Sequence, residues 1–217
     1  MLSGGLDSTV LAADALRDGP IVPLYVSVGF AWEAEEREML AALFSRPPFL
    51  GTTAPVALTF DMRDVYPPYH WAVRGTPPAF DSPDEDVYLS GRNIILLSKA
   101  SVYLATADLA PSRVLMGQLA GNPFPDATPA FLRAIGQALS LGLGTTMDVD
   151  APLARMRKAD VIRQGIELGV PLELTLSCMQ PLNGLHCGRC SKCRERRDAF
   201  AEAGVADPTT YSEAPPR

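Results

Sequence analysis

The sequence has little cysteine and no excess of positive charge, and each shortage excludes a class of protein. Acidic residues outnumber basic ones 25 to 19, so the formal net charge is −6. Proteins that bind nucleic acid through its phosphates are usually basic, and direct binding of nucleic acid is therefore disfavoured. Only four cysteines occur among 217 residues, which is too few for a disulfide scaffold.

Long apolar runs are also missing. No stretch approaches the ~18 uninterrupted apolar residues of a membrane-spanning helix, so we expect no membrane span. The first residues lack the charged start and apolar run of a secretory signal, and we expect a cytoplasmic protein. Because 47% of the residues are hydrophobic, the chain can build a core, which excludes a disordered chain.

Apolar periodicity predicts strands and helices in alternation. Helices are expected over 9–17, 33–44, 90–107, 128–141, 158–168 and 194–203, and strands over 21–28, 56–60, 113–116 and 148–150. This alternation is typical of an α/β fold in which a parallel twisted sheet carries helices on both faces. The proline-rich segment 61–89 is expected to be irregular, and both a functional loop and a surface excursion remain open interpretations.

A turn with two glycines leads into the first expected helix. Its residues are Ser3-Gly4-Gly5-Leu6-Asp7-Ser8. The glycines let the backbone approach a ligand closely, and the start of a helix favours an anion. The spacing is not that of a Walker loop, which needs four residues between its glycines and then Gly-Lys. An ordinary Ser/Asp helix cap is the alternative interpretation.

The four cysteines gather toward the other end of the chain. Cys187, Cys190 and Cys193 are separated by two residues each, and Cys178 precedes them. Four thiolates at such spacing suit a tetrahedral Zn²⁺ ion, and a site with four protein ligands is closed and therefore structural. An iron–sulfur cluster remains open as an alternative, whereas disulfides across two-residue gaps would be strained.

The opening turn is similar to the pyrophosphate loop of the N-type ATP pyrophosphatases, and together with the cysteines it resembles the ExsB-type family of 7-cyano-7-deazaguanine synthases. Further segments that carry the resemblance are Gly91-Arg92-Asn93-Ile94, Ala151-Pro152-Leu153, Lys158-Ala159-Asp160-Val161-Ile162 and Leu174-Thr175-Leu176-Ser177-Cys178. The resemblance covers nearly the whole chain. It implies an adenine nucleotide alpha hydrolase-like nucleotide-binding domain over 1–170 and a zinc-binding segment with a helix over 171–217. In that superfamily a central strand precedes the loop, and we expect that this chain lacks most of it.

An ATP-dependent carbon–nitrogen ligase is the activity that the resemblance implies. In that family ATP adenylates the carboxylate of 7-carboxy-7-deazaguanine, and ammonia then displaces AMP to give the amide. A second ATP activates the amide oxygen, and loss of AMP leaves the nitrile, an intermediate of queuosine biosynthesis. The implied cofactors are ATP with Mg²⁺ and a structural Zn²⁺. The implied partners are the deazapurine substrate, ammonia and a second copy of the chain in a homodimer.

The resemblance also assigns site residues. The residues assigned to catalysis are Ser3, Asp7, Arg92 and Lys158, whose hydroxyl and charges suit phosphate oxygens and Mg²⁺. Those assigned to the nucleotide are Leu2, Ser3, Gly4, Gly5, Leu6, Asp7, Ser8, Thr9, Val10 and Gly117. The substrate candidates are Phe30, Trp32, Asn93 and Asp126, and the metal ligands are Cys178, Cys187, Cys190 and Cys193.

Two segments depart from the family pattern and leave the acceptor base open. The family's Gly-Gln-Arg-His reads Gly29-Phe30-Ala31-Trp32 here, and its Gly-Tyr-Pro-Asp-Cys-Arg corresponds to residues 122–128. Phe30 and Trp32 either stack on a purine-like ring or pack in the core. The open alternatives for the whole chain are a tRNA-thiolating or other adenylating enzyme of the same superfamily and a non-catalytic zinc-binding module.

Overall fold

The computed structural model describes residues 1–109, 112–214 and 216. Its helices are α1 (Leu6–Ala15), α2 (Glu33–Phe44), α3 (Trp71–Arg74), α4 (Arg92–Thr106), α5 (Pro129–Leu143), α6 (Lys158–Glu167) and α7 (Ser191–Ala203). Its strands are β1 (Leu24–Ser27), β2 (Val56–Thr59), β3 (Ser112–Leu115) and β4 (Met147–Asp150), with short 3-10 turns η1 (Asp84–Val87), η2 (Pro125–Ala127) and η3 (Leu172–Leu174). None of the helices in these ranges combines the length and the apolar character that crossing a membrane requires.

The four strands form two separate two-stranded sheets, and the strands within each sheet run parallel. β1 pairs with β2 from Leu24↔Val56 to Ser27↔Thr59, and β3 pairs with β4 from Ser112↔Met147 to Leu115↔Asp150. The first two residues of the chain lie between the pairs. The amino group of Met1 donates to the carbonyl oxygen of Leu115 (2.7 Å), and the N–H of Leu2 donates to that of Leu24 (2.8 Å). The opening turn therefore starts between β1 of one sheet and β3 of the other.

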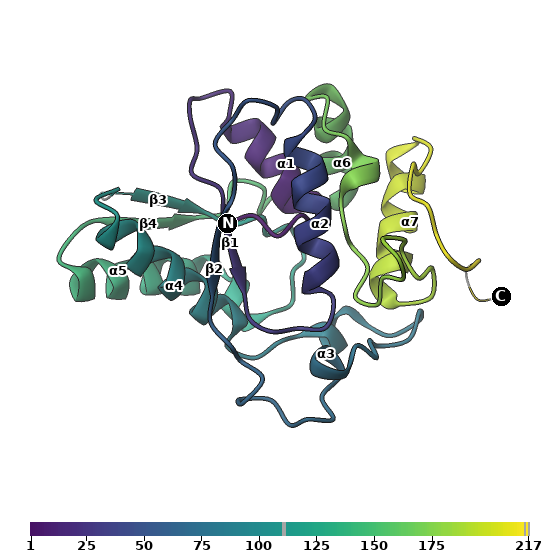
Figure 1. Cartoon of the computed structure of the whole chain (residues 1–217), viewed down its shortest axis with the longest axis horizontal. Coiled ribbons are helices and arrows are strands. Elements are labelled where there is room, and N and C mark those ends of the chain that lie inside the picture. Colours follow the sequence, from purple (N-terminus) through teal and green to yellow (C-terminus); the bar gives the residue numbers. More distant parts are fainter. Residues whose placement is uncertain (110–111, 215, 217) are drawn as a thin grey trace.

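Helices pack on both faces of these strands. On one face α4 and α5 pack against the strands, and Leu24 of β1 joins their apolar cluster. On the other face Tyr25, the next residue of β1, packs among the apolar residues of α1, α2 and α6. Neighbouring side chains of a strand point to opposite faces, so these two residues mark the two layers. Along the long axis, α5 lies toward one end of the molecule and α7 toward the other (Figure 1). The expected α/β fold with helices on both faces is confirmed.

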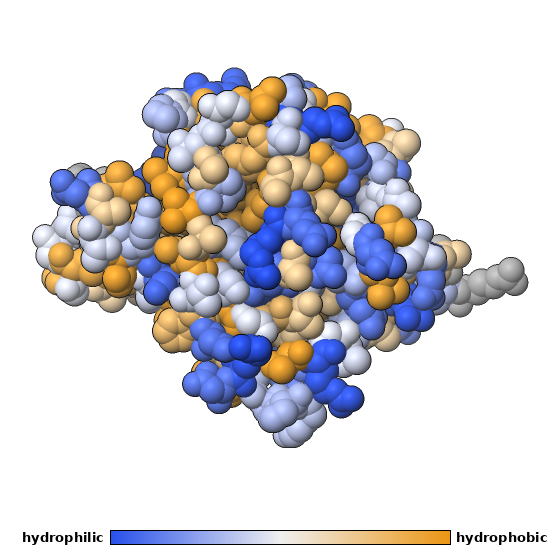
Figure 2. Space-filling view, in the orientation of Figure 1, coloured by the Kyte–Doolittle hydropathy of each residue, from blue (hydrophilic) through white to orange (hydrophobic). Residues whose placement is uncertain are grey.

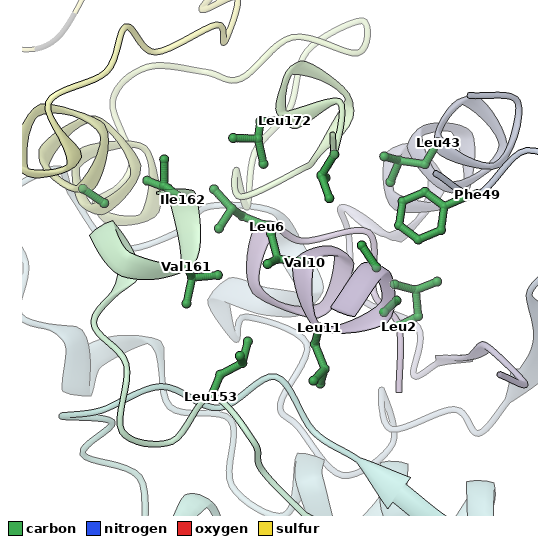
Figure 3. Packing of buried hydrophobic residues seen from close by; sticks show 14 of the residues in the cluster. Leu2, Leu6, Val10, Leu11, Leu43, Phe49, Leu153, Val161, Ile162 and Leu172 are labelled. Atoms are coloured by element: carbon green, nitrogen blue, oxygen red, sulfur yellow. The ribbon is translucent and has the colours of Figure 1, made fainter. Parts of the chain in front are cut away.

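The largest cluster of buried apolar side chains surrounds α1. Leu6 and Val10 of α1 lie beside Val161 and Ile162 of α6 (Figure 3), and all four are at most 2% exposed. The two helices come very close at Gly165 of α6, where a Cβ atom would lie 2.8 Å from Cγ2 of Val10. Because α1 begins at the end of the opening turn, this packing also anchors the turn.

The ends of most elements lie within a few residues of the expected positions. The first helix starts earlier, at Leu6, because the turn is already helical after its second glycine. The last helix also starts earlier, at Ser191, directly after the third cysteine. The side chain of Thr128 accepts a hydrogen bond from the N–H of Phe131 (3.2 Å), so Thr128, the first residue of the helix expected over 128–141, is the N-cap of α5.

The segment 61–89 holds more structure than the sequence predicts. It includes α3 and η1, and Trp71 of α3 stacks on Trp32 with ring centroids 5.6 Å apart. The hydroxyl of Tyr66 donates to the carbonyl oxygen of Ser90 (2.7 Å). At the lower edge of Figure 2 strongly hydrophilic residues lie beside paler and hydrophobic ones, and Val65 and Tyr69 of this segment are exposed. The inner side of the segment is therefore packed, whereas its outer side is mixed.

Candidate active site and metal centre

A cavity of about 260 Å³ lies beside the opening turn. Its walls come from the turn, from β1, from α2, from the start of α4, from the end of the segment 61–89 and from the residues that follow β3. The polar residues in these walls are Ser3, Asp7, Ser8, Tyr25, Glu36, Tyr88, Arg92, Asn93, Gln118, Asn122 and Asp126. Parallel sheets commonly bind ligands near the carboxyl ends of their strands, and this cavity has such a position.

The two serines of the opening turn brace its backbone. The N–H of Ser3 donates to Oγ of Ser8 (3.2 Å), and the N–H of Gly5 donates to Oγ of Ser3 (3.3 Å). The hydroxyl of Ser8 in turn donates to the carbonyl oxygen of Gly5 (3.0 Å). No side chain of the described residues caps the start of α1, so the alternative of an ordinary Ser/Asp cap does not fit. The first N–H groups of the helix thus remain suited to an anion.

Gly117 lets the segment after β3 approach the opening turn. A Cβ atom at this position would lie 3.0 Å from the backbone nitrogen of Ser8 and 3.1 Å from its Cα. Both atoms belong to the backbone, so a side chain here would push the two walls of the cavity apart. Gly117 itself lines the cavity, as do Leu2 and Gly5.

Four further residues assigned to the nucleotide do not line the cavity and lie on the inner side of the turn. Leu6 and Val10 are buried in the cluster around α1 and do not line the cavity. Thr9 is fully buried, and its hydroxyl donates to the carbonyl oxygen of Gly5 (2.9 Å). Gly4 has a φ of +78°, which favours glycine. These four residues shape the turn from inside the protein.

Four buried polar atoms of the cavity residues have no hydrogen-bond partner within the described part of the chain. They are Oδ1 of Asp7, Nε of Arg92, Oε1 of Gln118 and Oδ1 of Asp126. A buried polar atom without a partner costs about 1–3 kcal/mol, so such atoms are rare unless a ligand or water completes them. Three acceptors and one donor from separate segments indicate a polar ligand with groups of both kinds.

Lys158 lies behind the opening turn, outside the lining of the cavity. Its ammonium is 3.4 Å from Oδ2 of Asp7 and also pairs with the carboxylate of Glu195 on α7. Burial by itself lowers the pKa of Lys158, but the two carboxylates raise it above its usual value, so the ammonium stays charged. Burial raises the pKa of Asp7, and Lys158 opposes that rise. The positive charge of Lys158 is therefore already shared by two carboxylates.

Glu36 of α2 is a cavity residue that no motif of the sequence indicates. It is 7% exposed and accepts hydrogen bonds from the Tyr25 hydroxyl (3.0 Å) and from Nε1 of Trp32 (3.1 Å). Burial raises the pKa of Glu36 to about 7, and nearby Arg92 acts in the opposite direction. In the sequence it is one of several glutamates at the start of a helix, a pattern that the helix dipole explains.

Asp126 ties three segments together in the cavity wall. Its Oδ2 accepts from the N–H of Asn93 (3.3 Å). Its carbonyl oxygen accepts from the side-chain amides of Asn93 (3.1 Å) and Gln118 (3.4 Å). The structure thus brings together the substrate candidates Asn93 and Asp126 and adds Gln118. A lone glutamine after a short strand has no sequence signal that could have identified it.

Phe30 and Trp32 do not line the cavity. They are 4% and 5% exposed and pack in an aromatic cluster with Tyr66 and Trp71. The geometry therefore favours the core role that the sequence left open for them. The guanidinium of Arg92 lies over the ring of Phe30, 5.8 Å from its centroid, so this cluster supports a cavity residue from behind.

The four cysteines form one compact cluster at the start of α7. All four are buried and outside disulfides, and their sulfur atoms lie within 4.8 Å of one another. The Cys193 sulfur is 3.9 Å from that of Cys187 and 3.5 Å from that of Cys190. Four sulfurs held at ~2.3 Å by one tetrahedral ion lie about 3.8 Å apart, so the cluster fits a metal ion such as Zn²⁺. Cys178 also accepts from the N–H groups of Cys187 (3.2 Å) and Gln180 (3.3 Å), as metal-bound thiolates often do.

Comparisons with known proteins support the resemblance. The family model described as queuosine biosynthesis protein QueC matches residues 78–204. A curated 7-cyano-7-deazaguanine synthase from Anaeromyxobacter sp. (strain Fw109-5) is 34% identical over 226 residues, covering 97% of this chain and 94% of the relative. Relatives of the same name from Methanothrix thermoacetophila and Geobacter sp. (strain M21) are 35% and 31% identical over 97% and 98% of this chain, and over 96% of each relative. The chain therefore belongs to the QueC family of queuosine biosynthesis proteins.

Proposed function

We propose that this chain is an ATP-dependent ligase that makes 7-cyano-7-deazaguanine from 7-carboxy-7-deazaguanine and ammonia. One observation carries the proposal: the opening turn and the polar atoms of Asp7, Arg92, Gln118 and Asp126, which have no cap and no partners among the described residues, meet in a single cavity. The turn suits phosphates, whereas Gln118 and Asp126 in the same lining offer acceptors for a polar ring. Membership of the QueC family and the names of the relatives support the same reaction.

In this proposal the start of α1 holds the outer phosphates of ATP. Gly5, Asp7 and Ser8 at the start of this helix line the cavity, and the backbone N–H groups and the helix dipole at such a start favour an anion. When the substrate carboxylate attacks the α-phosphate, negative charge builds on the departing pyrophosphate, and these groups stabilise it. Oδ1 of Asp7, which has no partner among the described residues, is suited to hold Mg²⁺. The ion would neutralise charge on the phosphates.

The reaction proceeds in two rounds of activation at this one site. In the first, a carboxylate oxygen displaces pyrophosphate from ATP, and ammonia then adds to the acyl carbon while AMP leaves, which gives the amide. In the second, the amide oxygen displaces pyrophosphate from another ATP, and departure of AMP and of protons leaves the nitrile. Arg92 lines the cavity, its Nε has no partner in the described part of the chain, and it is suited to the phosphate under attack. Adenylation itself makes the carbon electrophilic, so no cysteine nucleophile is required.

The cysteine cluster holds Zn²⁺ in a structural role in this proposal. All four coordination positions would be taken by buried thiolates, which leaves none for a substrate or water. The ion would tie the segment before α7 to the helix itself, because Cys178 and Cys193 lie on either side of that connection. Its contribution would be to folding, as is usual for structural zinc.

The test incubates the intact protein with ATP, ammonium and 7-carboxy-7-deazaguanine and follows the products by mass spectrometry. We expect the nitrile together with AMP and pyrophosphate. Amide without nitrile would show that the second activation is missing. Formation of ADP in place of AMP, or no acid-dependent use of ATP, would overturn the proposal. Light scattering of the same sample measures the expected homodimer.

A further inference from the structure

We propose that Gln118 and Asp126 form an edge of two hydrogen-bond acceptors that selects a guanine-like base. This inference rests on the proposed function and names the groups that would recognise the acceptor base. Gln118 is 7% exposed and Asp126 5% exposed, and both lie in the wall of the cavity beside the opening turn. The departures from the family pattern left this recognition open in the sequence.

The carboxylate of Asp126 is held in place from one side. Its Oδ2 accepts the backbone N–H of Asn93 at the start of α4 (3.3 Å), while Oδ1 has no partner within the described ranges. Asn93 also donates its side-chain amide to the Asp126 carbonyl oxygen (3.1 Å). Asn93 is thus a positioning residue, and the free oxygen of Asp126 is an acceptor prepared for a donor on a ligand.

The side chain of Gln118 is oriented by the same residue. Its Nε2 donates to the carbonyl oxygen of Asp126 (3.4 Å), which leaves Oε1 as the atom without a partner in the described chain. A buried amide turned in this way presents an acceptor. Oε1 of Gln118 and Oδ1 of Asp126 are thus two acceptors in the lining of one cavity, and since neither has a partner among the described residues, they suit a ligand with two donors.

An aromatic pair in the same cavity provides a surface for a flat ring. Tyr88 and Phe124 both line the cavity, and their rings stack with centroids 5.1 Å apart and an interplanar angle of 30°. The N–H of Phe124 donates to Oδ1 of Asn122 (2.9 Å), which holds this part of the wall. A base that lies against these rings is within the same cavity as the acceptor edge.

The donor pattern of a guanine-like base matches this edge. Guanine and its 7-deaza analogues carry a ring N–H beside an exocyclic amino group, which are two adjacent donors. Adenine has an acceptor nitrogen at the corresponding ring position, which would face the carboxylate unfavourably, and hypoxanthine lacks the amino donor. A site built from buried acceptors rejects such analogues because its own groups remain unpaired. This edge would therefore select the deazaguanine substrate and exclude the adenine of ATP from that position.

The first test measures binding to the intact protein by isothermal titration calorimetry without ATP. The ligands are 7-carboxy-7-deazaguanine and its analogue without the 2-amino group. We expect the analogue to bind about 10- to 100-fold more weakly, because one acceptor loses its partner. Equal affinity of the two ligands, or binding of neither, would overturn the inference. This comparison uses the unaltered protein and does not depend on the folding of a variant.

The second test exchanges an acceptor for a donor. Asp126→Asn places an amide where the carboxylate stands, and we expect it to shift preference at least about 10-fold toward the analogue with oxygen in place of the 2-amino group. Asp148→Asn, on an exposed residue of β4, is the matched control. Gln118→Met should weaken binding of 7-carboxy-7-deazaguanine about 10-fold, with Gln137→Met on the exposed face of α5 as its control.

Acid-dependent exchange of labelled pyrophosphate into ATP separates this inference from the proposed function. If 7-carboxy-7-deazaguanine and its analogue without the 2-amino group drive the exchange equally, the result supports the ligase and overturns the selective edge of Gln118 and Asp126. Selective binding of the guanine-type acid without exchange would support the edge and overturn the proposed reaction. If Asp126→Asn leaves the ratio of affinities for 7-carboxy-7-deazaguanine and its 2-oxo analogue unchanged, the edge is contradicted, whether or not exchange occurs.

Discussion

At the scale of single residues, the cavity is distinguished by ionisable groups that are buried with few partners. Asp7 pairs with Lys158 through one oxygen, and Glu36 is held by neutral donors from Tyr25 and Trp32. On ordinary protein surfaces such groups are solvated, whereas here Glu36 is 7% exposed and Oδ1 of Asp7 is buried. Their charge and protonation therefore depend on neighbours that can be altered one at a time.

Asp7→Asn tests the role of the carboxylate in the opening turn. The amide keeps the shape of the side chain but loses the charge that suits Mg²⁺, so we expect AMP formation to fall on the order of 100-fold. AMP is measured by chromatography, and the zinc content should stay unchanged. Asp14→Asn, farther along α1 and paired with exposed Arg17, is the control and should keep full activity. Normal turnover in Asp7→Asn would refute the assigned role.

Glu36 makes stability depend on pH. Its ordinary pKa of 4.5 rises to about 7 in the folded protein, so between these values the folded state binds the proton more tightly than the unfolded state. The stabilisation from this group is present below pH 4.5 and is lost as the pH rises through about 7. Glu36→Gln removes this dependence. Relative to the unaltered protein, the variant should gain about 2–3 kcal/mol of unfolding free energy between pH 5 and pH 8.

Urea denaturation at the two pH values measures this gain. Glu38→Gln, an exposed position of the same helix, should show no such change with pH. If Glu36→Gln differs from the unaltered protein by the same amount at pH 5 and pH 8, the carboxyl is ionised in the folded state and the argument fails.

At the scale of elements, α6 connects the opening turn to the cysteine cluster. It packs against α1 on one side and against α7 on the other. Lys158, its first residue, pairs with Asp7 of α1 and with Glu195 of α7, and Lys192 pairs with the same glutamate (2.6 Å). The turn and the cluster, far apart in the sequence, are thus joined through one helix.

Glu195→Gln should weaken this connection. Lys158 and Glu195 are 18% and 24% exposed, so loss of the carboxylate leaves a largely buried ammonium with less compensation, at a cost of about 1–3 kcal/mol in unfolding free energy. Glu202→Gln is a matched control. Glu202 lies on α7 and pairs with Arg157, directly before α6, but both of these side chains are exposed. The control should lose less than about 1 kcal/mol. Equal losses in chemical denaturation would contradict the special role of Glu195.

Gly165→Ala should force α1 and α6 apart. The added methyl group would lie 2.8 Å from Cγ2 of Val10, which is closer than packed atoms tolerate, and we expect a loss of about 1–3 kcal/mol. Gly142→Ala on α5 meets no atom within 4 Å and should instead stabilise by up to about 1 kcal/mol. Thermal denaturation of both variants measures the contrast. Stabilisation by Gly165→Ala would show that the helices are not in contact there.

At the scale of the whole molecule, the cysteine cluster gathers segments from across the chain. The backbone of Cys190 forms an isolated antiparallel β-bridge with Ala79 of the segment 61–89. His186, which precedes Cys187, forms a parallel β-bridge with Tyr211 near the end of the chain. Arg196 of α7 is 1% exposed and donates to Oγ1 of Thr175 (2.9 Å). The arrangement of this end of the molecule therefore depends on whatever holds the four sulfurs together.

Removal of the metal should loosen that whole end. We expect one Zn²⁺ per chain and a colourless protein, and treatment with a strong chelator should make all four thiols reactive and lower the thermal midpoint. Metal analysis, a thiol reagent and calorimetry measure these effects. Cys178→Ser should have the same consequences as the chelator. Iron in the purified protein with a brown colour would instead support the iron–sulfur alternative.

Local motifs make the turn and the cysteine cluster predictable from the sequence. Ser3, Gly4 and Gly5 carry their signal within a few residues, and Cys187, Cys190 and Cys193 indicate a shared ligand by their spacing alone. Thr128 predicts the start of α5 for the same reason, because a cap acts on the N–H groups that follow it. Helix and strand positions follow from apolar periodicity, which reflects the local geometry of each element.

Thus the amino-acid sequence by itself determined the α/β alternation, the glycine-rich opening turn, the four-cysteine cluster and the family of this protein. Only the tertiary structure decided that Phe30 and Trp32 are buried, that Lys158 is shared between two carboxylates, and that Gln118 faces the same cavity as Asp126. The reason is physical. A motif depends on neighbours in sequence, whereas burial, pairing and the lining of a cavity depend on neighbours in space, which the packing of the strands and helices brings together.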